Sequence, residues 1–174
     1  ATIIDKKALP QTKGDIELDG KVKGDYGKEI YPAIDAALKI KNGEIAYRGM
    51  ANKLDKVEAD LTVLIDPSNV EKSFFNLDNC EISSKNTSIK IKVHTSNLMG
   101  NTALDANLDG NIDLSELQKT IPFKEEIKLK GNFDSKLEIS FTKEDIKNSN
   151  FGNIQGKGFF ILDDFLAENS SKNN

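Results

Sequence analysis

Apolar and polar residues alternate along most of this 174-residue chain, which is the pattern of β-strands with one apolar and one solvated face. The clearest run extends from Leu104 to Leu114, where aspartates and asparagines separate the apolar residues. Comparable runs occupy residues 15–23, 34–41, 54–65, 73–82, 89–94, 126–141 and 153–164. We therefore predict a mainly β fold with about eight or nine long antiparallel strands, forming a curled groove or a sandwich.

The dipeptide Asn42-Gly43 separates the run 34–41 from Ile45 and Tyr47, which continue the alternation. Asn-Gly between two alternating runs is the strongest short-range signal for a tight β-hairpin. We therefore predict a hairpin turn at Asn42-Gly43. We also expect a strand irregularity near Asn79-Cys80.

Two short helices are expected beside the strands. One follows the run 104–114 and covers Leu114–Thr120, before Pro122. The other begins after Thr142, which is placed as an N-cap with acidic residues in the first turn, and it ends by residues 148–152. Residues 1–14 are expected to form a flexible lead-in, 15–165 a single β-rich domain, and 166–174 a polar tail.

The stretch from Thr102 to Phe123 has a second interpretation, as a calcium-binding EF-hand loop. Gly110 would supply the sharp turn of such a loop, and a terminal carboxylate would complete it. The candidate ligands are Asp105, Asn107, Asp109, Asn111 and Glu116. The residues before the loop are poor helix formers, however, and a calcium loop does not require apolar side chains at Ala106 and Leu108. The strand interpretation is therefore favoured, and no metal or other cofactor is predicted. The alternative function is a calcium-binding structural or adhesion domain that uses an EF-hand-like loop at 105–116.

Composition and charge argue against several classes of protein. Net charge is −4 and lysines are mixed with acidic residues, which disfavours nucleic acid as a partner. No run approaches the ~18 apolar residues of a membrane-spanning helix, and the first residues lack a signal-peptide pattern. The single cysteine excludes a disulfide within the chain.

Residues with catalytic potential are few. His94 lies on the polar side of its run beside lysines, and it is interpreted as a surface residue. Cys80 is interpreted as a small buried or half-buried thiol. Asp163-Asp164 has no third partner in the sequence, so no enzymatic function is predicted.

The apolar sides of the strands must be buried against something, and two short helices are too few to cover them. A sandwich is the simpler solution, because large exposed apolar patches are rare in soluble monomers. A curled sheet that holds an apolar ligand is the alternative. In both cases one apolar surface should contain Leu108, Ile112, Leu129, Phe133 and Leu137. If the sheet forms a groove, these side chains should face the lipid.

Three segments together resemble the AsmA-like family of bacterial envelope proteins. They are YPAIDAALKIKNGEIAYRGM, LDANLDGNIDLSELQKTIPF and LKGNFDSKLEISFTKEDIKNSNFGNIQGKGFFILDDF, and they lie between residues 15 and 165. The most characteristic part is Gly110, Asp113-Leu114, Leu117 and Pro122-Phe123. In the family this strand runs into a helical turn without calcium.

The resemblance implies a curled β-sheet groove, related to bridge-like lipid-transfer proteins, that takes part in phospholipid movement and outer-membrane biogenesis. It implies the periplasmic side of the envelope, and a parent protein anchored in the inner membrane. We expect this chain to be an interior or C-terminal part of such a protein. Its expected ligand is a lipid or another apolar molecule, and contact with the membrane would involve other parts of the parent.

Overall fold

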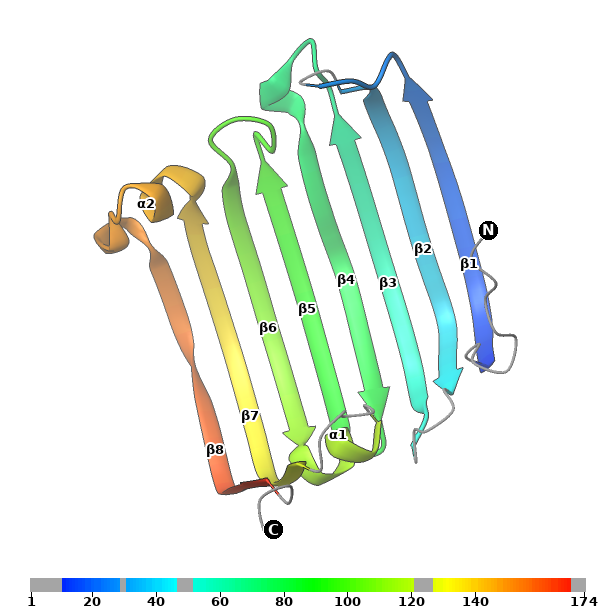
Figure 1. Ribbon diagram of the computed structural model, residues 1–174, viewed down its shortest axis with the longest axis vertical. Coiled ribbons are helices and arrows are strands. Elements are labelled where there is room, and N and C mark those ends of the chain that lie inside the picture. The colour runs from blue at the N-terminus through cyan, green and yellow to red at the C-terminus, as the bar shows by residue number, and fades with distance from the viewer. Residues whose placement is uncertain (1–10, 29–30, 47–51, 121–126, 170–174) are drawn as a thin grey trace.

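The computed structural model describes residues 11–28, 31–46, 52–120 and 127–169, which form one open sheet of eight strands (Figure 1). Each strand pairs antiparallel with the next in sequence, from β1 at one edge to β8 at the other. The strands are β1 (Gln11–Lys23), β2 (Ala33–Ala46), β3 (Leu54–Ile65), β4 (Phe74–Ser84), β5 (Thr87–Ser96), β6 (Ala103–Asp113), β7 (Ile127–Thr142) and β8 (Gln155–Asn169). The mainly β prediction is confirmed. Of the two predicted arrangements, the described residues form a single open layer and no sandwich.

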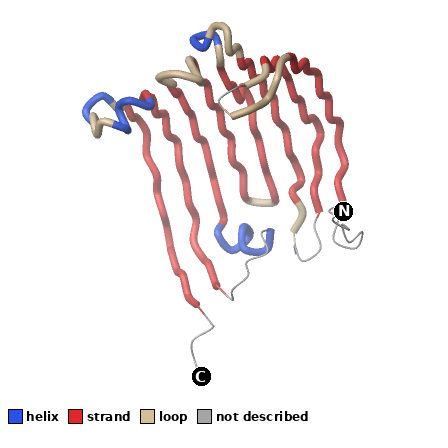
Figure 2. The backbone as a smooth tube through the Cα atoms, turned by 45° about the horizontal axis from the view of Figure 1, so that its top comes forward, coloured by secondary structure: helices blue, strands red, loops and turns tan. Residues whose placement is uncertain are grey.

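Helices occur only at the two ends of the strands (Figure 2). Helix α1 (Leu114–Thr120) follows β6, and α2 (Lys143–Lys147) follows β7 at the opposite end. Short 3-10 turns occupy Val70–Lys72 and Phe151–Asn153. Both predicted helices are therefore present, and neither covers a face of the sheet.

The start of α2 is capped as its sequence predicts. The Asp145 N–H donates to the Thr142 side chain, while the Thr142 N–H donates to the Asp145 carboxylate at 2.8 Å. This reciprocal pair satisfies two backbone donors that the first helical turn leaves unpaired. It fixes where β7 ends and the connection to β8 begins.

The hairpin predicted at Asn42-Gly43 is wrong, because both residues lie inside the continuous strand β2. They form a β-bulge opposite Gly14 of β1, and the pairing resumes beyond it. Asn42 has φ 53°, and a Cβ on Gly14 would lie 2.8 Å from the Gly43 Cα. The same left-handed backbone that suits a tight turn thus serves a bulge here. Tyr47, the predicted continuation, lies outside the described residues.

Three further bulges interrupt the sheet. In β3 the extra residue falls between Leu54 and Val57, opposite Ile45 and Gly43 of β2. In β4 the extra residue falls at Asp78-Asn79, which confirms the expected irregularity near Asn79-Cys80. In β8 it falls near Asp164, whose φ is 50°, opposite Gly131 of β7. Each bulge lets one strand run a residue longer than its partner without ending the ladder.

The strands also extend beyond the predicted domain limits of 15 and 165. Residues 11–13 continue β1, because the bulge at Asn42-Gly43 restores their pairing with residues 44–46. Residues 166–169, predicted as part of a polar tail, pair with residues 127–130 of β7. Lead-in residues 1–10 and tail residues 170–174 lie outside the described residues.

Candidate functional site

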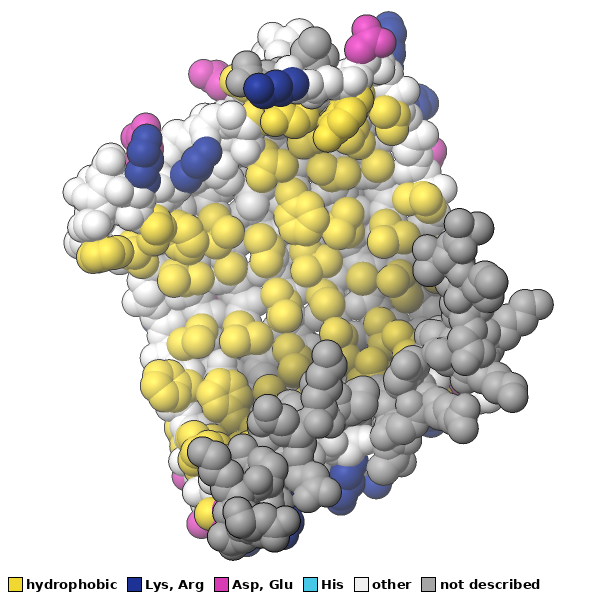
Figure 3. All heavy atoms as spheres, viewed as in Figure 1, with side chains coloured by type: hydrophobic (Ala, Val, Ile, Leu, Met, Phe, Trp, Pro, Cys, Tyr) yellow, Lys and Arg dark blue, Asp and Glu magenta, His cyan; other side chains and the backbone are white. Residues whose placement is uncertain are grey.

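One side of the sheet is apolar across all eight strands. Residues paired directly across an antiparallel ladder share a face, so the register can be followed from edge to edge. One row reads Leu18, Leu38, Leu61, Leu77, Val93, Ala106, Ile139 and Gly156. The next reads Ile16, Ile40, Ala59, Cys80, Ile91, Leu108, Leu137 and Gly158. We call this side the apolar face. Figure 3 shows its hydrophobic side chains extending across the sheet, with the charged side chains in view at the margins.

The apolar face has nothing packed on it among the described residues. No hydrophobic side chain there is fully buried, and Leu18 and Phe160 keep 75% and 71% of their surface exposed. Eight strands at about 4.8 Å spacing, with apolar residues over about eight positions, give a face of roughly 34 by 26 Å, or about 900 Å². The largest apolar patch of a typical monomer is about 300–600 Å². A face of this size requires an occupant.

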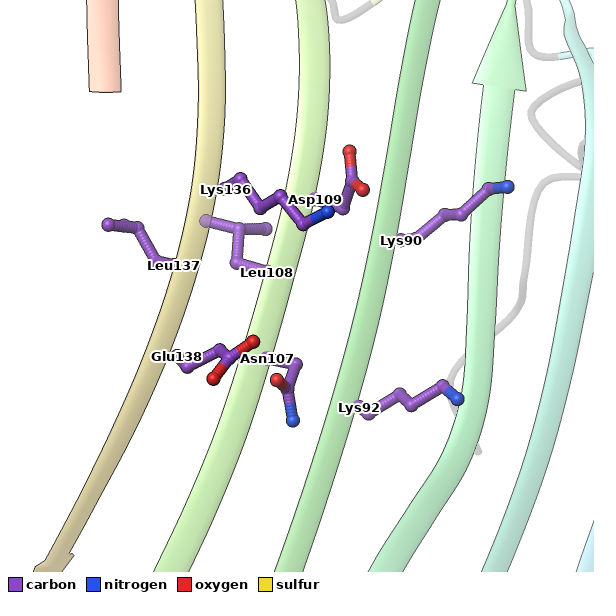
Figure 4. Close-up of a pocket in the computed structure, with 8 residues that line it drawn as sticks. All are labelled: Lys90, Lys92, Asn107, Leu108, Asp109, Lys136, Leu137 and Glu138. Atoms are coloured by element: carbon purple, nitrogen blue, oxygen red, sulfur yellow. The ribbon is translucent and has the colours of Figure 1, made fainter. Parts of the chain in front are cut away.

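The opposite side carries the charges. Cross-strand ion pairs join Lys41 to Glu17 at 3.0 Å and Lys56 to Glu81 at 2.9 Å. A shallow depression of about 310 Å³ lies where Lys90 and Lys92 meet residues of β6 and β7 (Figure 4). Its wall includes cations and carboxylates, and it holds no concentrated charge of one sign. This side is a charged, solvated surface over most of the sheet, and at the β8 edge it also exposes Phe159 and Ile161.

The five residues predicted to share an apolar surface lie on β6 and β7. Leu108 pairs directly with Leu137, and Ile112 pairs with Phe133. Leu129 lies on β7 beyond the last residue paired with β6, and its N–H donates to the Gln118 side chain of α1 at 2.9 Å. The register therefore brings four of the five together as neighbours. Their role toward a lipid stays a prediction.

The candidate calcium ligands are spread along β6 and α1. Asp105, Asn107, Asp109 and Asn111 alternate along the charged side of β6, as the strand interpretation predicts. Glu116 lies on α1 and accepts from Lys119 Nζ at 2.9 Å, which contributes most to holding the pKa of Glu116 below its ordinary value. The described residues contain no cluster of three or more histidines, cysteines or acidic residues suited to a metal ion.

His94 and Cys80 lie on opposite sides of the sheet. His94 Nε2 contacts the Asp78 carboxylate at 2.9 Å on the charged side, where both are about half exposed. Cys80 is a free thiol on the apolar face, and its burial raises the pKa of the thiol. Since a thiolate is the reactive form, Cys80 is a weak nucleophile in this setting.

The sequence analysis missed a gap in the apolar face at the β8 edge. Gly156 and Gly158 pair with Ile139 and Leu137, so two rows of apolar side chains end there without a side chain. Together with Phe160 these residues border a depression of about 500 Å³. The sequence signal was the two glycines on the inward positions of a predicted strand, which often mark a close approach of another molecule or backbone.

No protein-family model matches this chain, and no characterised protein or solved structure is significantly similar to it. The resemblance to the AsmA-like family therefore stays a prediction from the sequence. Among the described residues, no helix combines the length and hydrophobicity needed to cross a membrane.

Proposed function

We propose that this chain is a non-catalytic β-sheet segment that holds the acyl chains of phospholipids on its apolar face. In this proposal it is part of an AsmA-like envelope protein on the periplasmic side, whose parent is anchored in the inner membrane. The proposed role is phospholipid transfer or outer-membrane biogenesis. The observation that carries the proposal is an uncharged apolar face that spans all eight strands and has no covering layer among the described residues.

The composition of the face suits hydrocarbon chains. Its paired positions carry leucine, isoleucine, valine, alanine and phenylalanine, and the polar members, such as Cys80 and Ser135, are uncharged. Acyl chains form no hydrogen bonds, so they lose nothing on such a surface and gain the burial of apolar area, worth about 25 cal/mol per Å². The gap at Gly156 and Gly158 adds a depression beside Phe160 that a chain can fill.

The charged side supports the same arrangement. The ion pair between Lys41 and Glu17 is solvent-exposed and the pair between Lys56 and Glu81 is partly buried, and the charges of this side keep it in water. A sheet with one wet side and one apolar side presents a lipid to only one side. Lipid tails can then lie on the apolar face while the charged residues of the other side stay in water.

A substitution at Leu108 tests the proposal. Leu108 lies near the centre of the apolar face, and its neighbour Asn107 on β6 faces the charged side. Leu108→Asp should leave the protein folded, because the new carboxylate is solvated when the face is empty. It should sharply reduce the uptake of a fluorescent or photo-crosslinkable phospholipid, since a lipid tail would bury that charge unpaired. Asn107→Asp, with the same added charge on the other side, should not.

The alternative occupant is protein: a second copy stacked face to face as a sandwich. That arrangement predicts a wild-type dimer of two stacked sheets and a Leu108→Asp variant that dissociates or unfolds. Light scattering and circular dichroism on both variants distinguish the two cases. A well-folded monomeric wild type that takes up no phospholipid would contradict the proposal.

A further inference from the structure

Large apolar side chains are exposed outside the strands at only one end of the described sheet. This end carries the connections β1–β2, β3–β4, β5–β6 and β7–β8 (Figure 1), and we call it the loop end. The exposed apolar residues of its connections are Tyr26, Tyr31, Val70, Ile146 and Phe151. Tyr26 and Phe151 expose 84% and 63% of their surface. At the opposite end, the described connections include the β4–β5 turn, which holds Lys85 and Asn86, and helix α1, whose leucines are only partly exposed.

A cavity joins the loop end to the apolar face. It measures about 420 Å³, and loop residues Tyr26, Tyr31, Leu98 and Met99 line it together with strand residues. The strand residues of this lining, Ile34 and Ile65, pair with each other at the ends of β2 and β3 and belong to the apolar face. An apolar lining therefore continues from the face to the tips of the loops.

The charges of the loop end nearly cancel. Its described connections carry four lysines and five acidic residues, and no arginine. The lysines are Lys28, Lys72, Lys143 and Lys147, and the acidic residues are Asp25, Asp66, Glu71, Glu144 and Asp145. This balance gives no attraction to an anionic surface. An uncharged, zwitterionic surface matches it best.

We propose that the loop end docks on the interface of a zwitterionic phospholipid bilayer, with Tyr26, Ile146 and Phe151 inserted among the headgroups. Aromatic residues prefer the boundary between headgroups and hydrocarbon. The apolar tips belong to separate connections with charged residues between them, which a fluid interface accommodates. A protein partner instead buries one contiguous, shape-matched patch. This inference rests on the proposed function, because the cavity would let a lipid tail pass from the bilayer to the apolar face.

The absence of tryptophan from the sequence permits a direct test. Phe151→Trp places a single fluorophore at the loop end, and Asn86→Trp places one at the opposite end as the matched control. Both proteins are mixed with phosphatidylcholine vesicles, with and without brominated acyl chains. The emission of F151W should shift to the blue and be quenched by the bromines, whereas the emission of N86W should not change.

Adding Tyr26→Ser and Ile146→Ser to F151W should weaken vesicle binding by about tenfold or more, since each substitution removes an inserted apolar side chain. The same variant should still bind monomeric short-chain phosphatidylcholine on the apolar face. If the wild type did not bind short-chain phosphatidylcholine, that result would count against the proposed function of the apolar face. It would not bear on whether the loop end docks on a bilayer. Equal quenching of F151W and N86W, or none of either, would overturn the docking proposal. A blue shift of F151W that depends on protein concentration without vesicles would overturn it too, and would indicate self-association.

Discussion

Two glycines on the same face of β8 should respond in opposite ways to the same substitution. At Gly158, φ is +136°, and an added Cβ would lie 1.9 Å from the Lys136 carbonyl oxygen and 2.9 Å from the Leu137 Cα. These are backbone atoms of β7, which cannot rotate aside. At Gly156 an added Cβ would meet nothing within 4 Å. Gly158→Ala should therefore separate β7 from β8 locally, and Gly156→Ala should be accommodated.

The magnitude follows from the two costs at Gly158. An L-residue held in a sparsely populated backbone region costs about 1–3 kcal/mol, and loss of two ladder hydrogen bonds costs about 1 kcal/mol each. Gly158→Ala should thus lower the free energy of unfolding by about 3–5 kcal/mol. Gly156→Ala should raise it by about 0.5 kcal/mol, because alanine loses less backbone entropy than glycine on folding.

Urea denaturation of the three proteins, followed by circular dichroism, measures these differences. With a slope of about 2 kcal/mol per M, the midpoint of Gly158→Ala should fall by roughly 1.5–2.5 M. Hydrogen exchange should locate the loss of protection in β7 and β8 and leave β2 to β5 unchanged. Equal midpoints for the two alanine variants would refute the close approach of β8 to β7 at Gly158.

Three further predictions concern ions and titratable groups. Calorimetry should detect no micromolar calcium binding, because Asp105 and Asp109 are roughly 13 Å apart along β6; such binding, abolished by Glu116→Gln, would contradict the strand interpretation. Hydrogen bonds from Thr142 and then Asn153 hold the pKa of Asp145 below its ordinary value. The stability from this lowered pKa is present above the unfolded value of about 3.9 and is lost as pH falls through the folded pKa. The melting temperature of Asp145→Asn should therefore lie below that of the wild type at neutral pH, and the gap should narrow toward pH 3; a constant gap would contradict this. Because the pKa of Cys80 is raised, its alkylation by maleimide should be slow. Bound phospholipid should slow this alkylation further, and a rate that phospholipid does not change would count against lipid on the apolar face.

Alternation alone predicted most of this fold. The strand around Leu108, the helix at Leu114–Thr120 and the cap at Thr142 each follow from local periodicity or local hydrogen bonding, and the structure contains all three. These features depend on neighbours in sequence, so a single sequence specifies them.

The error at Asn42-Gly43 had a non-local cause. Asn-Gly adopts the same left-handed backbone in a turn and in a bulge, and only the partner strands decide between them. Ile40 pairs with Ile16, and Ile45 pairs with Thr12, so five steps on β2 match four on β1. The sequence held a clue: the apolar positions change from even to odd numbers between Ile40 and Ile45. A change of parity within a strand is a sign of one extra residue.

What covers the apolar face was the other question that alternation left open. Period-two patterning shows that a strand has an apolar side, but the pattern is the same in a sandwich and in an open sheet. The choice depends on whether the chain folds back over itself. In the described residues it does not, because every connection joins neighbouring strands.

The positions of the bulges indicate whether the apolar face has a function or is only a by-product of forming the sheet. Each one falls where the apolar positions change parity: between Ile40 and Ile45, between Leu54 and Val57, between Leu77 and Cys80, and between Leu162 and Ala167 of β8. Without the extra residue, the second apolar side chain of each pair would point to the charged side. Each bulge disrupts ladder hydrogen bonds, a cost that a sheet without a use for a continuous face would not need to bear. Four such bulges that keep the same face apolar are the outcome expected if that face binds something apolar along its whole width.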